Sequence, residues 1–393
     1  MLLPILAILS SIAALVLHGI LTWEHFLSRF GSASQTPLCR IGSIFNCAVV
    51  AVSDYSQFIL QIPNSILGFW TNLAFLVFLS WAIIESRFFK REVPLAISMS
   101  QLLSYLILGA SIVMGMISAF LLKHFCLFCV LAYLASLVQF FSTFFLFRGK
   151  NSVWNPNTLK TSSITIVTIL GISYLTKEII YDQLGGERLT YFIEESLVHW
   201  RSEEKKVFDY QLGITYHPAQ TSSSRTLIEF VDPFCPHCKF ASENLKSFIE
   251  TRQGTLRLIV KTFPLDGNCN PHIDHKTEDR RRCDWSAWLL CMDQNQWGPL
   301  AVDWLFQNQA QLVRMSFKEG VTKFIEQYPN GPDLEQLLLC VGSQETQKKI
   351  AQMSAEGHQA KIRGTPAIFL DDKLLSGGHL PMVLERALRE LRE

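Results

Sequence analysis

Residues 225–238 read RTLIEFVDPFCPHC, and this stretch decides the fold of the second half of the chain. Its apolar and β-forming start predicts a buried strand, and the two cysteines follow where a helix begins. Cysteines at positions i and i+3 in a first helical turn can bond to each other, and the positive helix end lowers the pKa of the first thiol. Pro236 suits that turn because its missing N–H is not needed there. We predict a redox pair, Cys235 and Cys238, with a protonated His237 lowering the first pKa further.

A second element of the same domain is Thr365-Pro366, directly before an apolar stretch at 367–370 that predicts a late strand. A proline there, in the cis form, would bring a backbone edge beside the cysteines and leave polar groups free to pair with a substrate chain. The other periodic stretches predict a helix, a strand, a mostly helical region and a closing amphipathic helix, at residues 239–252, 256–263, 284–360 and 381–391. This order predicts an α/β domain with a helical insertion.

The α/β domain carries four further cysteines, at positions 269, 283, 291 and 340. Their even number predicts two structural disulfides, although four cysteines allow three connectivities. We expect Cys269 to pair with Cys283, closing a charged loop, and Cys291 to pair with Cys340, joining parts of the helical region. A second redox relay is the alternative, but none of these pairs has Cys-x-x-Cys spacing.

The first half of the chain contains four long apolar runs, at residues 2–23, 66–84, 95–122 and 125–147. Each can cross a hydrocarbon core about 30 Å thick, which takes about 20 helical residues. A weaker fifth run covers residues 162–181. The sequence therefore predicts a multidomain protein: a transmembrane four-helix bundle at 1–150, a fifth helix and linker at 151–185, and the α/β domain at 186–393.

Basic residues gather in two of the connectors between these runs, at Arg87, Lys90, Arg91, Arg148, Lys150 and Lys160. The positive-inside rule places both connectors in the cytosol. We therefore expect a cytoplasmic amino terminus, an outer loop at 24–61 and, after a fifth crossing, an extracytoplasmic α/β domain. Glu24 and His25 are expected to be solvated residues at the end of the first helix. The net charge of +1 gives no indication of a nucleic-acid partner.

A second Cys-x-x-Cys pair, Cys126 and Cys129, begins the fourth apolar run at its outer end. The spacing again puts both sulfurs on one helical face. A cysteine in a helix bundle can also be a small hydrophobic residue. Cys39 and Cys47 lie in the outer loop, where they form either a structural disulfide or a shuttle that carries electrons from the α/β domain to the membrane pair.

Cys235-Pro236-His237-Cys238 and Thr365-Pro366, on either side of a helical insertion, resemble a thioredoxin-fold domain of the DsbA-like type, over residues 225–393. The resemblance implies that Cys235 is the exposed attacking cysteine and that Cys238 is its buried partner. Domains of this type often have valine before the cis-proline, whereas this chain has Thr365. Donor, isomerase and reductase behaviour therefore all stay open.

A set of polar landmarks in the first half closely resembles the vitamin K epoxide reductase family, over residues 5–147: Cys39, Cys47, Ser53, Asn64, Cys126, Cys129 and Tyr133. Fusion to a thioredoxin-fold domain looks like the bacterial members, which couple disulfide formation to quinone reduction. Carried over by position, Cys129 would face the quinone, Cys126 would exchange with Cys47, and Cys39 would exchange with the α/β domain.

The same resemblance implies that Ser53, Asn64 and Tyr133 line the quinone pocket. Each also has a plainer interpretation. Ser53 and Asn64 can cap helices, since serine and asparagine are favoured at helix starts. Tyr133 can be an interfacial aromatic residue, which is common at membrane surfaces.

Together these features predict a thiol:quinone oxidoreductase of the inner, or cytoplasmic, membrane. Its substrates would be reduced extracytoplasmic proteins, its electron acceptor ubiquinone or menaquinone, and no metal would be needed. One alternative is a reductase or isomerase that carries electrons outward. Another is a membrane-tethered module that binds Cu or Zn at its Cys-x-x-Cys pairs. The absence of Met-rich or His-rich tracts near those pairs argues against the metal module.

Overall fold

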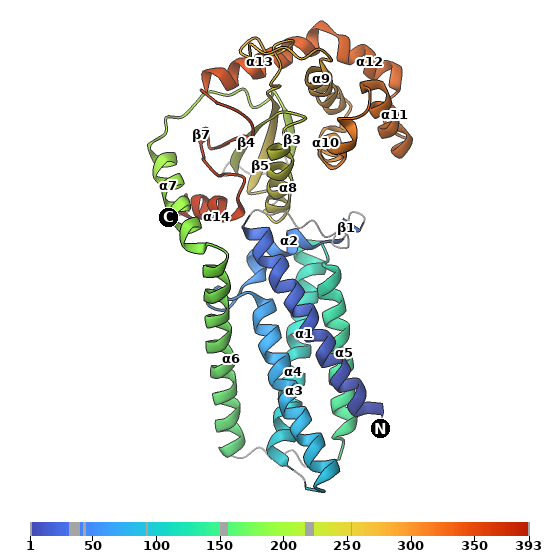
Figure 1. Cartoon of the computed structure of the whole chain (residues 1–393), viewed down its shortest axis with the longest axis vertical. Coiled ribbons are helices and arrows are strands. Elements are labelled where there is room, and N and C mark those ends of the chain that lie inside the picture. Colours follow the sequence, from blue (N-terminus) through green and yellow to red (C-terminus); the bar gives the residue numbers. More distant parts are fainter. Residues whose placement is uncertain are drawn as a thin grey trace. The chain divides into compact units, whose positions relative to one another are not determined.

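The computed structural model of the protein describes residues 2–30, 40–41, 45–91, 93–149, 156–216, 224–252 and 254–391. The chain divides into two compact units, Met1–Leu189 and Thr190–Glu393 (Figure 1). The first unit is helical and the second combines a mixed sheet with helices, as the sequence predicts. The helix α7 (Gly186–Ser202) crosses the division between them.

The first unit is built on long apolar helices. Five helical segments are long and apolar enough to cross a membrane: Leu2–Arg29, Asn64–Phe88, Pro94–Leu122, Leu127–Leu146 and Thr158–Gln183. They correspond to α1 (Leu2–Arg29), α3 (Asn64–Phe88), α4 (Pro94–Met116) with a following π-helical turn (Ile117–Leu122), α5 (Leu127–Leu146) and α6 (Pro156–Gln183). All five predicted apolar runs lie largely within these segments.

Short elements connect α1 to α3 at one end of the bundle. They are an antiparallel pair of strands, β1 (Arg40–Ile41) and β2 (Phe45–Asn46), then α2 (Cys47–Val52) and a 3-10 turn (Asp54–Ser56). The amide N–H of Asn46 donates to the carbonyl of Phe125 at 2.9 Å. This bond ties the segment that precedes Cys47 to the segment that precedes Cys126.

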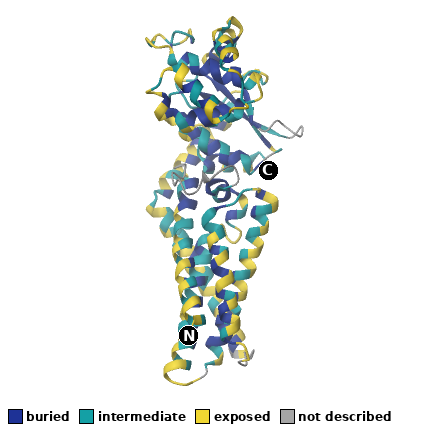
Figure 2. Cartoon of the chain, turned by 90° about the vertical axis from the view of Figure 1, so that its right-hand side faces the viewer, coloured by how far each residue is buried: buried dark blue, intermediate teal, exposed yellow. Residues whose placement is uncertain are grey.

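Many residues on the outside of the bundle are exposed (Figure 2), and they include large apolar side chains. Several of the buried serine hydroxyls bond within their own helix. The hydroxyl of Ser11 donates to the carbonyl of Ala7 at 2.6 Å, and that of Ser100 to Ala96 at 2.7 Å. Such bonds satisfy polar groups within their own helix, as a lipid environment requires. Phe141, for example, stays 52% exposed, which suits a side chain that faces lipid rather than water.

The second unit has a five-stranded sheet in the order β3-β5-β4-β6-β7. The bounds of the strands are Ile214–Tyr216, Arg225–Val231, Leu256–Thr262, Ala367–Leu370 and Lys373–Leu374 for β3 to β7 in chain order. The strands β4 and β5 are parallel, with Leu227 opposite Leu258, and the other neighbouring pairs are antiparallel. Apolar side chains of β4, β5 and β6 form a core cluster of this unit, and the sheet is largely coloured as buried in Figure 2.

Helices cover the sheet and form the predicted insertion. Their bounds are α8 (Pro236–Glu250), α9 (Arg281–Gln294), α10 (Gly298–Leu312), α11 (Phe317–Gln327), α12 (Leu334–Gly342), α13 (Gln344–Gln359) and α14 (Pro381–Glu390). A cluster of aromatic rings fills the insertion, including Trp285, Trp288 and Trp304, each at most 2% exposed. This second core makes the insertion a packed body, able to hold the residues that contact the cysteine loop.

Candidate active sites

The first Cys-x-x-Cys pair lies where β4 passes into α8. Cys235 is the residue before the helix, and Pro236 occupies the first helical position. The amide N–H of Cys238 donates to the carbonyl of Cys235 at 3.1 Å, which closes the first turn. Cys235 keeps 8% of its surface exposed while Cys238 keeps none, and both are free thiols. An incoming group can therefore reach only the first sulfur.

Hydrogen bonds around Cys235 favour its thiolate. The Cys238 thiol makes the largest contribution, and the backbone N–H groups of Cys238 and His237 add to it. Together they lower the pKa of Cys235 to about 5, although burial opposes them. Burial raises the pKa of Cys238 well above the usual thiol range. His237 acts here through its backbone N–H, and its own side chain is exposed.

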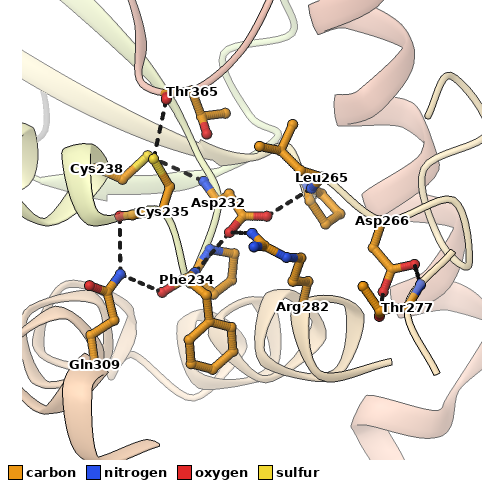
Figure 3. A network of polar contacts seen from close by, with 12 residues as sticks. Asp232, Phe234, Cys235, Cys238, Leu265, Asp266, Thr277, Arg282, Gln309 and Thr365 are labelled. Atoms are coloured by element: carbon orange, nitrogen blue, oxygen red, sulfur yellow. Dashed lines mark hydrogen bonds and ion pairs between the residues drawn. The ribbon is translucent and has the colours of Figure 1, made fainter. Parts of the chain in front are cut away.

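The loop before the cysteines is held from two sides (Figure 3). The Asp232 carboxylate accepts hydrogen bonds from the N–H of Phe234 at 2.8 Å and of Leu265 at 2.7 Å, and it forms an ion pair with Arg282 of α9. From α10, the Gln309 amide donates to the carbonyl of Pro233 at 2.9 Å and to that of Cys235 at 3.1 Å. The helical insertion thus fixes the backbone that carries the reactive thiol.

Thr365 and Pro366 lie directly against this pair. The peptide bond between them is cis, and the Cys235 sulfur is 3.2 Å from the Thr365 carbonyl oxygen. The contact brings the segment before β6 beside the accessible thiol (Figure 3). A backbone edge in this place can pair with an extended substrate chain while its thiol approaches Cys235.

A carboxylic acid lies beneath the pair. Glu229 on β4 is fully buried, and the Ser242 hydroxyl donates to one of its oxygens at 3.1 Å. Burial raises the pKa of Glu229 to about 8, and negative charge on Cys235 adds to the effect. The acid can therefore hold a proton near the buried thiol at neutral pH.

The four remaining cysteines of this unit form two disulfides. Cys269 bonds to Cys283, and Cys291 bonds to Cys340. These are the pairs put forward from the sequence. The first bond closes the loop before α9 directly beside Arg282, the partner of Asp232. The second joins α9 to α12.

The second Cys-x-x-Cys pair begins α5 in the first unit. Cys126 is the residue before the helix, and its sulfur accepts a hydrogen bond from the N–H of Cys129 at 3.4 Å. Cys126 is 2% exposed and Cys129 is half-buried, and both are free thiols. In this pair the second cysteine is the more accessible one.

Cys47 lies against this pair. It starts α2, whose first turn is capped by Asn46, and it shares an apolar cluster with Val50, Leu122 and Cys126. Cys47 is in a disulfide. Cys39, which we expect to be a shuttle cysteine, lies outside the described residues.

A cavity of about 620 Å³ opens beside the second pair, within the helical unit. Cys47, Cys126 and Cys129 line one part of it, and its walls are mostly apolar side chains of α1, α3, α4, α5 and α6. Helix α6, the fifth of the membrane-length helices, contributes Ile166, Ile169 and Leu170 to this wall.

Two of the three residues assigned to the predicted pocket line this cavity, namely Asn64 and Tyr133. The Asn64 amide donates to the carbonyl of Tyr55 at 2.8 Å, and Pro63 rather than Asn64 precedes the helix. Ser53 does not line the cavity. Its buried hydroxyl donates to the carbonyl of Val50, and Ser56 lies in the wall instead.

Glu24 and His25 are not solvated residues at a helix end, which corrects the expectation from the sequence. Helix α1 continues to Arg29, and both side chains are 5% exposed and line the cavity. The charge pattern suggested a helix end because acidic and basic residues usually face water. Here the Arg29 side chain bonds to Ser53 and Ser56, so the segment around α2 lies against that last turn.

Comparison with known proteins assigns both units. Residues 5–144 match the vitamin K epoxide reductase family, and residues 217–390 match a thioredoxin family. The chain is a vitamin K epoxide reductase domain fused to a thioredoxin-like domain. The two domains make it a thiol-disulfide oxidoreductase. Among curated proteins, none matches the sequence.

Several solved structures resemble the thioredoxin-like domain. A thioredoxin-like oxidoreductase from Silicibacter pomeroyi is 20% identical, with a TM-score of 0.35, over 45% of this chain and 91% of that one. The oxidoreductase NmDsbA1 from N. meningitidis is 16% identical, with a TM-score of 0.32, over 45% and 90%. MdbA, a thiol-disulfide oxidoreductase from Corynebacterium diphtheriae, is 17% identical, with a TM-score of 0.36, over 47% and 96%.

Several residues of the two domains escaped the sequence analysis. In the thioredoxin-like domain, Glu229 gave a signal, since it is an acid inside an apolar strand. Gln309 and Arg282 gave none, because they reach the loop from positions far along the chain. In the vitamin K epoxide reductase domain, His18 interrupts the first apolar run and lines the cavity. Among the described residues, no group of three or more His, Cys, Asp or Glu side chains is arranged to hold a metal ion.

Proposed function

We propose that this protein is a membrane thiol:quinone oxidoreductase that makes disulfides in extracytoplasmic proteins. The observation that carries the proposal is the Cys126/Cys129 pair, which opens into an apolar cavity among helices of membrane-spanning length. A quinone ring is flat and apolar and carries two carbonyl oxygens, so a largely apolar cavity with few polar groups suits it. Asn64 and Tyr133 supply polar groups in that wall.

The reaction begins at the oxidised Cys235–Cys238 pair. A substrate thiolate attacks the Cys235 sulfur, the bond between the two cysteines breaks, and a mixed disulfide forms. A second substrate thiolate then attacks the substrate's own sulfur in that mixed disulfide and releases Cys235. A thiol whose pKa is about 5 leaves readily as the thiolate at neutral pH. The substrate gains a disulfide, and the Cys235/Cys238 pair gains two electrons and ends in the dithiol state.

The electrons then move to the membrane pair by two further exchanges. The reduced pair gives two electrons to a Cys39–Cys47 disulfide, which in turn reduces a Cys126–Cys129 disulfide. In the last step the Cys126 and Cys129 thiols lose two electrons and two protons to the quinone, their disulfide closes, and quinol leaves. Fusion in one chain keeps the two domains at high local concentration, which favours the first exchange.

We place the protein in the inner, or cytoplasmic, membrane, with its amino terminus in the cytosol and the thioredoxin-like domain outside. Five candidate spans and the two basic connectors support this orientation. An oxidising compartment also suits the two disulfides of the thioredoxin-like domain.

The decisive experiment follows ubiquinone-1 reduction by the purified full chain in detergent, with either an unfolded, reduced protein or dithiothreitol as the electron donor. The parent should be active with both donors. Cys129→Ala should lose activity with both, because the quinone-facing thiol is gone. Cys235→Ala should lose activity with the protein donor and keep it with dithiothreitol. The matched control is a Cys291→Ser/Cys340→Ser double variant. It also removes two cysteines, but neither belongs to a Cys-x-x-Cys pair, so it should stay active with both donors.

Other outcomes separate the alternatives. Activity of Cys235→Ala with the protein donor would remove the thioredoxin-like domain from the route. A parent that reduces no quinone but reshuffles wrong disulfides would identify an isomerase or reductase. A parent that reduces no quinone and purifies with stoichiometric Cu or Zn would identify a metal-binding module.

A further inference from the structure

One polar side chain of the cavity wall has no role in the relay. His18 lies within α1, in the first candidate membrane span, and lines the cavity. Its Nδ1 atom is buried and has no hydrogen-bond partner among the residues that the structure describes. An ionisable residue inside a membrane span is costly, and an unpaired buried nitrogen adds to that cost. The nitrogen lies against Gly68 while the ring forms part of the cavity wall, so a rotation of the ring would bring it to a ligand oxygen.

The backbone of α3 makes room for this ring. A Cβ atom added to Gly68 would lie 2.3 Å from Cε1 of His18 and 2.6 Å from Nδ1, so the imidazole covers that glycine. One turn along α1, the Thr22 hydroxyl bonds to Ser65 at 3.0 Å and fixes α1 against α3. These contacts confine the ring to the interface of the two helices, at the cavity wall.

His18 also lies near the level of the cysteines. Leu21 packs against the cluster that contains Cys47, Cys126 and Cys129. Three residues of α-helix advance about 4.5 Å along the axis, which places His18 about one turn from that level. A ring held beside Cys129 can thus extend along the cavity toward His18.

The neighbouring polar groups are already bonded to the protein. The amide of Asn72 donates to the carbonyl of Gly68 at 2.8 Å, and its oxygen accepts from Gln139 at 2.8 Å. The Thr71 hydroxyl donates to the carbonyl of Leu67 at 2.7 Å. His18 differs from these side chains because its Nδ1 has no partner in the part of the chain that the structure describes, so turning the ring toward a ligand breaks no hydrogen bond at that atom.

We propose that His18 donates a hydrogen bond to the quinone oxygen that lies away from Cys129. This inference rests on the proposed function and adds a residue to it. As the dithiol delivers its two electrons, negative charge develops on the quinone oxygens, and an aligned donor stabilises that charge. The imidazole passes a proton to this oxygen and regains one of the two protons that the thiols release. His18 is therefore unchanged over the cycle.

The test compares ubiquinone-1 kinetics of three substitutions in the full chain in detergent, with dithiothreitol as donor so that the thioredoxin-like domain is bypassed. His18→Leu removes the donor, and we expect kcat/KM to fall about 10- to 100-fold. His18→Asn and His18→Gln keep an N–H group near Nδ1 and Nε2 respectively. We expect at least one of them to recover most of the loss, which a purely space-filling role would not produce.

A glycine pair separates crowding from general damage to the helices. Gly68→Ala puts a methyl group where the ring lies, so it should push the imidazole into the cavity and raise KM for ubiquinone-1 more than it lowers kcat. Gly19→Ala is the matched control, because nothing lies within 4 Å of a Cβ at that position. It should behave as the parent.

A second readout does not depend on the quinone. Dithiothreitol should reduce the Cys126–Cys129 disulfide at the same rate in the parent and in His18→Leu, measured by trapping free thiols and mass spectrometry. The inference is overturned if His18→Leu keeps kcat/KM within about twofold of the parent. Equal losses in all three His18 variants, together with slowed disulfide reduction, would also overturn it. A parent without quinone reduction would refute the proposed function itself, which is a distinct result.

Discussion

The two Cys-x-x-Cys pairs of this protein have the same local geometry and opposite accessibility. In both, the first cysteine precedes a helix and the second lies in its first turn. In the thioredoxin-like domain the first cysteine, Cys235, is the accessible one and Cys238 is fully buried. In the vitamin K epoxide reductase domain Cys126 is buried, and Cys129 is the more open residue and lines the cavity.

The difference lies in the surroundings of each pair. Cys235 meets the Thr365 carbonyl before a cis-proline, beside a backbone edge that can receive a peptide. Cys129 lines an apolar cavity that suits a flat ligand. In the proposed relay one motif serves two kinds of electron partner, because the groups packed around each pair decide which sulfur is reached.

The largest effect on activity should come from replacing Asn64, a polar residue of the cavity wall. Asn64→Leu removes an amide from the wall beside Cys129, and we expect kcat/KM for ubiquinone-1 to fall about 100-fold. Alkylation of Cys235 in the same variant should stay at the parental rate, because that pair does not use the cavity. Ser163→Ala, an exposed hydroxyl on α6, is the control. Equal loss of both activities would break the distinction between the two sites.

The next largest effect is the change of Cys235 reactivity with pH. Its thiolate is the reactive form and its pKa is lowered to about 5. Reactivity should therefore be fully present above about pH 6 and lost as the pH falls through 5. Between pH 7 and pH 4 the iodoacetamide rate at Cys235, followed by peptide mass spectrometry on the reduced full chain, should drop about tenfold. A midpoint near the ordinary thiol value of about 8.5 would contradict the hydrogen-bond account.

A smaller effect is expected at Glu229. Its pKa is raised to about 8, so the carboxyl is mostly neutral at pH 7 and becomes charged as the pH rises through 8. The charge then opposes formation of the Cys238 thiolate. Glu229→Gln should match the parent at pH 6 and exchange a few-fold faster through Cys238 at pH 9, measured as resolution of a mixed disulfide on Cys235. Glu243→Gln on α8 is the control for charge, and a Glu229→Gln effect that does not vary with pH would refute this role.

The smallest effect is expected from Gln309, which links the helical insertion to the loop that carries Cys235. Gln309→Leu removes the amide that donates to the carbonyls of Pro233 and Cys235, although the Cys235 carbonyl keeps the Cys238 N–H. We expect the free energy of unfolding to fall by about 1–2 kcal/mol and Cys235 alkylation to change no more than a few-fold. Asn308→Ala, which removes a side chain that donates within α10 to the carbonyl of Trp304, should leave the alkylation rate unchanged. If both variants change the alkylation rate of Cys235 equally, the hydrogen bonds from Gln309 to the loop do not control that rate.

Local patterns predicted most elements. The apolar runs predicted the five long helices, because a helix that spans a membrane needs a continuous apolar stretch. The stretch at 225–238 predicted β4 and the start of α8. The strands β3 and β7 were missed, since two or three residues show no period. Helix α1 was predicted too short because Glu24 resembles a helix end, whereas the chain buries it.

The candidate sites were predicted unevenly for a related reason. Cys235 and Cys129 stand in motifs, so spacing alone identified them. Asp232, Arg282 and Gln309 act together only because β4, α9 and α10 meet, and nothing in the sequence relates positions so far apart. Ser53 was assigned by its position in a family pattern, yet Ser56 lies in the cavity wall and Ser53 does not.

The sequence by itself determined the two Cys-x-x-Cys pairs, the length of the membrane helices and the order of the α/β domain. These depend on neighbours within a few residues, where helix and strand geometry fixes which side chains share a face. Only the tertiary structure decided that Glu229 is buried beneath one pair and that His18 lines the cavity beside the other. Accessibility and pKa depend on what packs around a group, and that packing comes from distant parts of the chain.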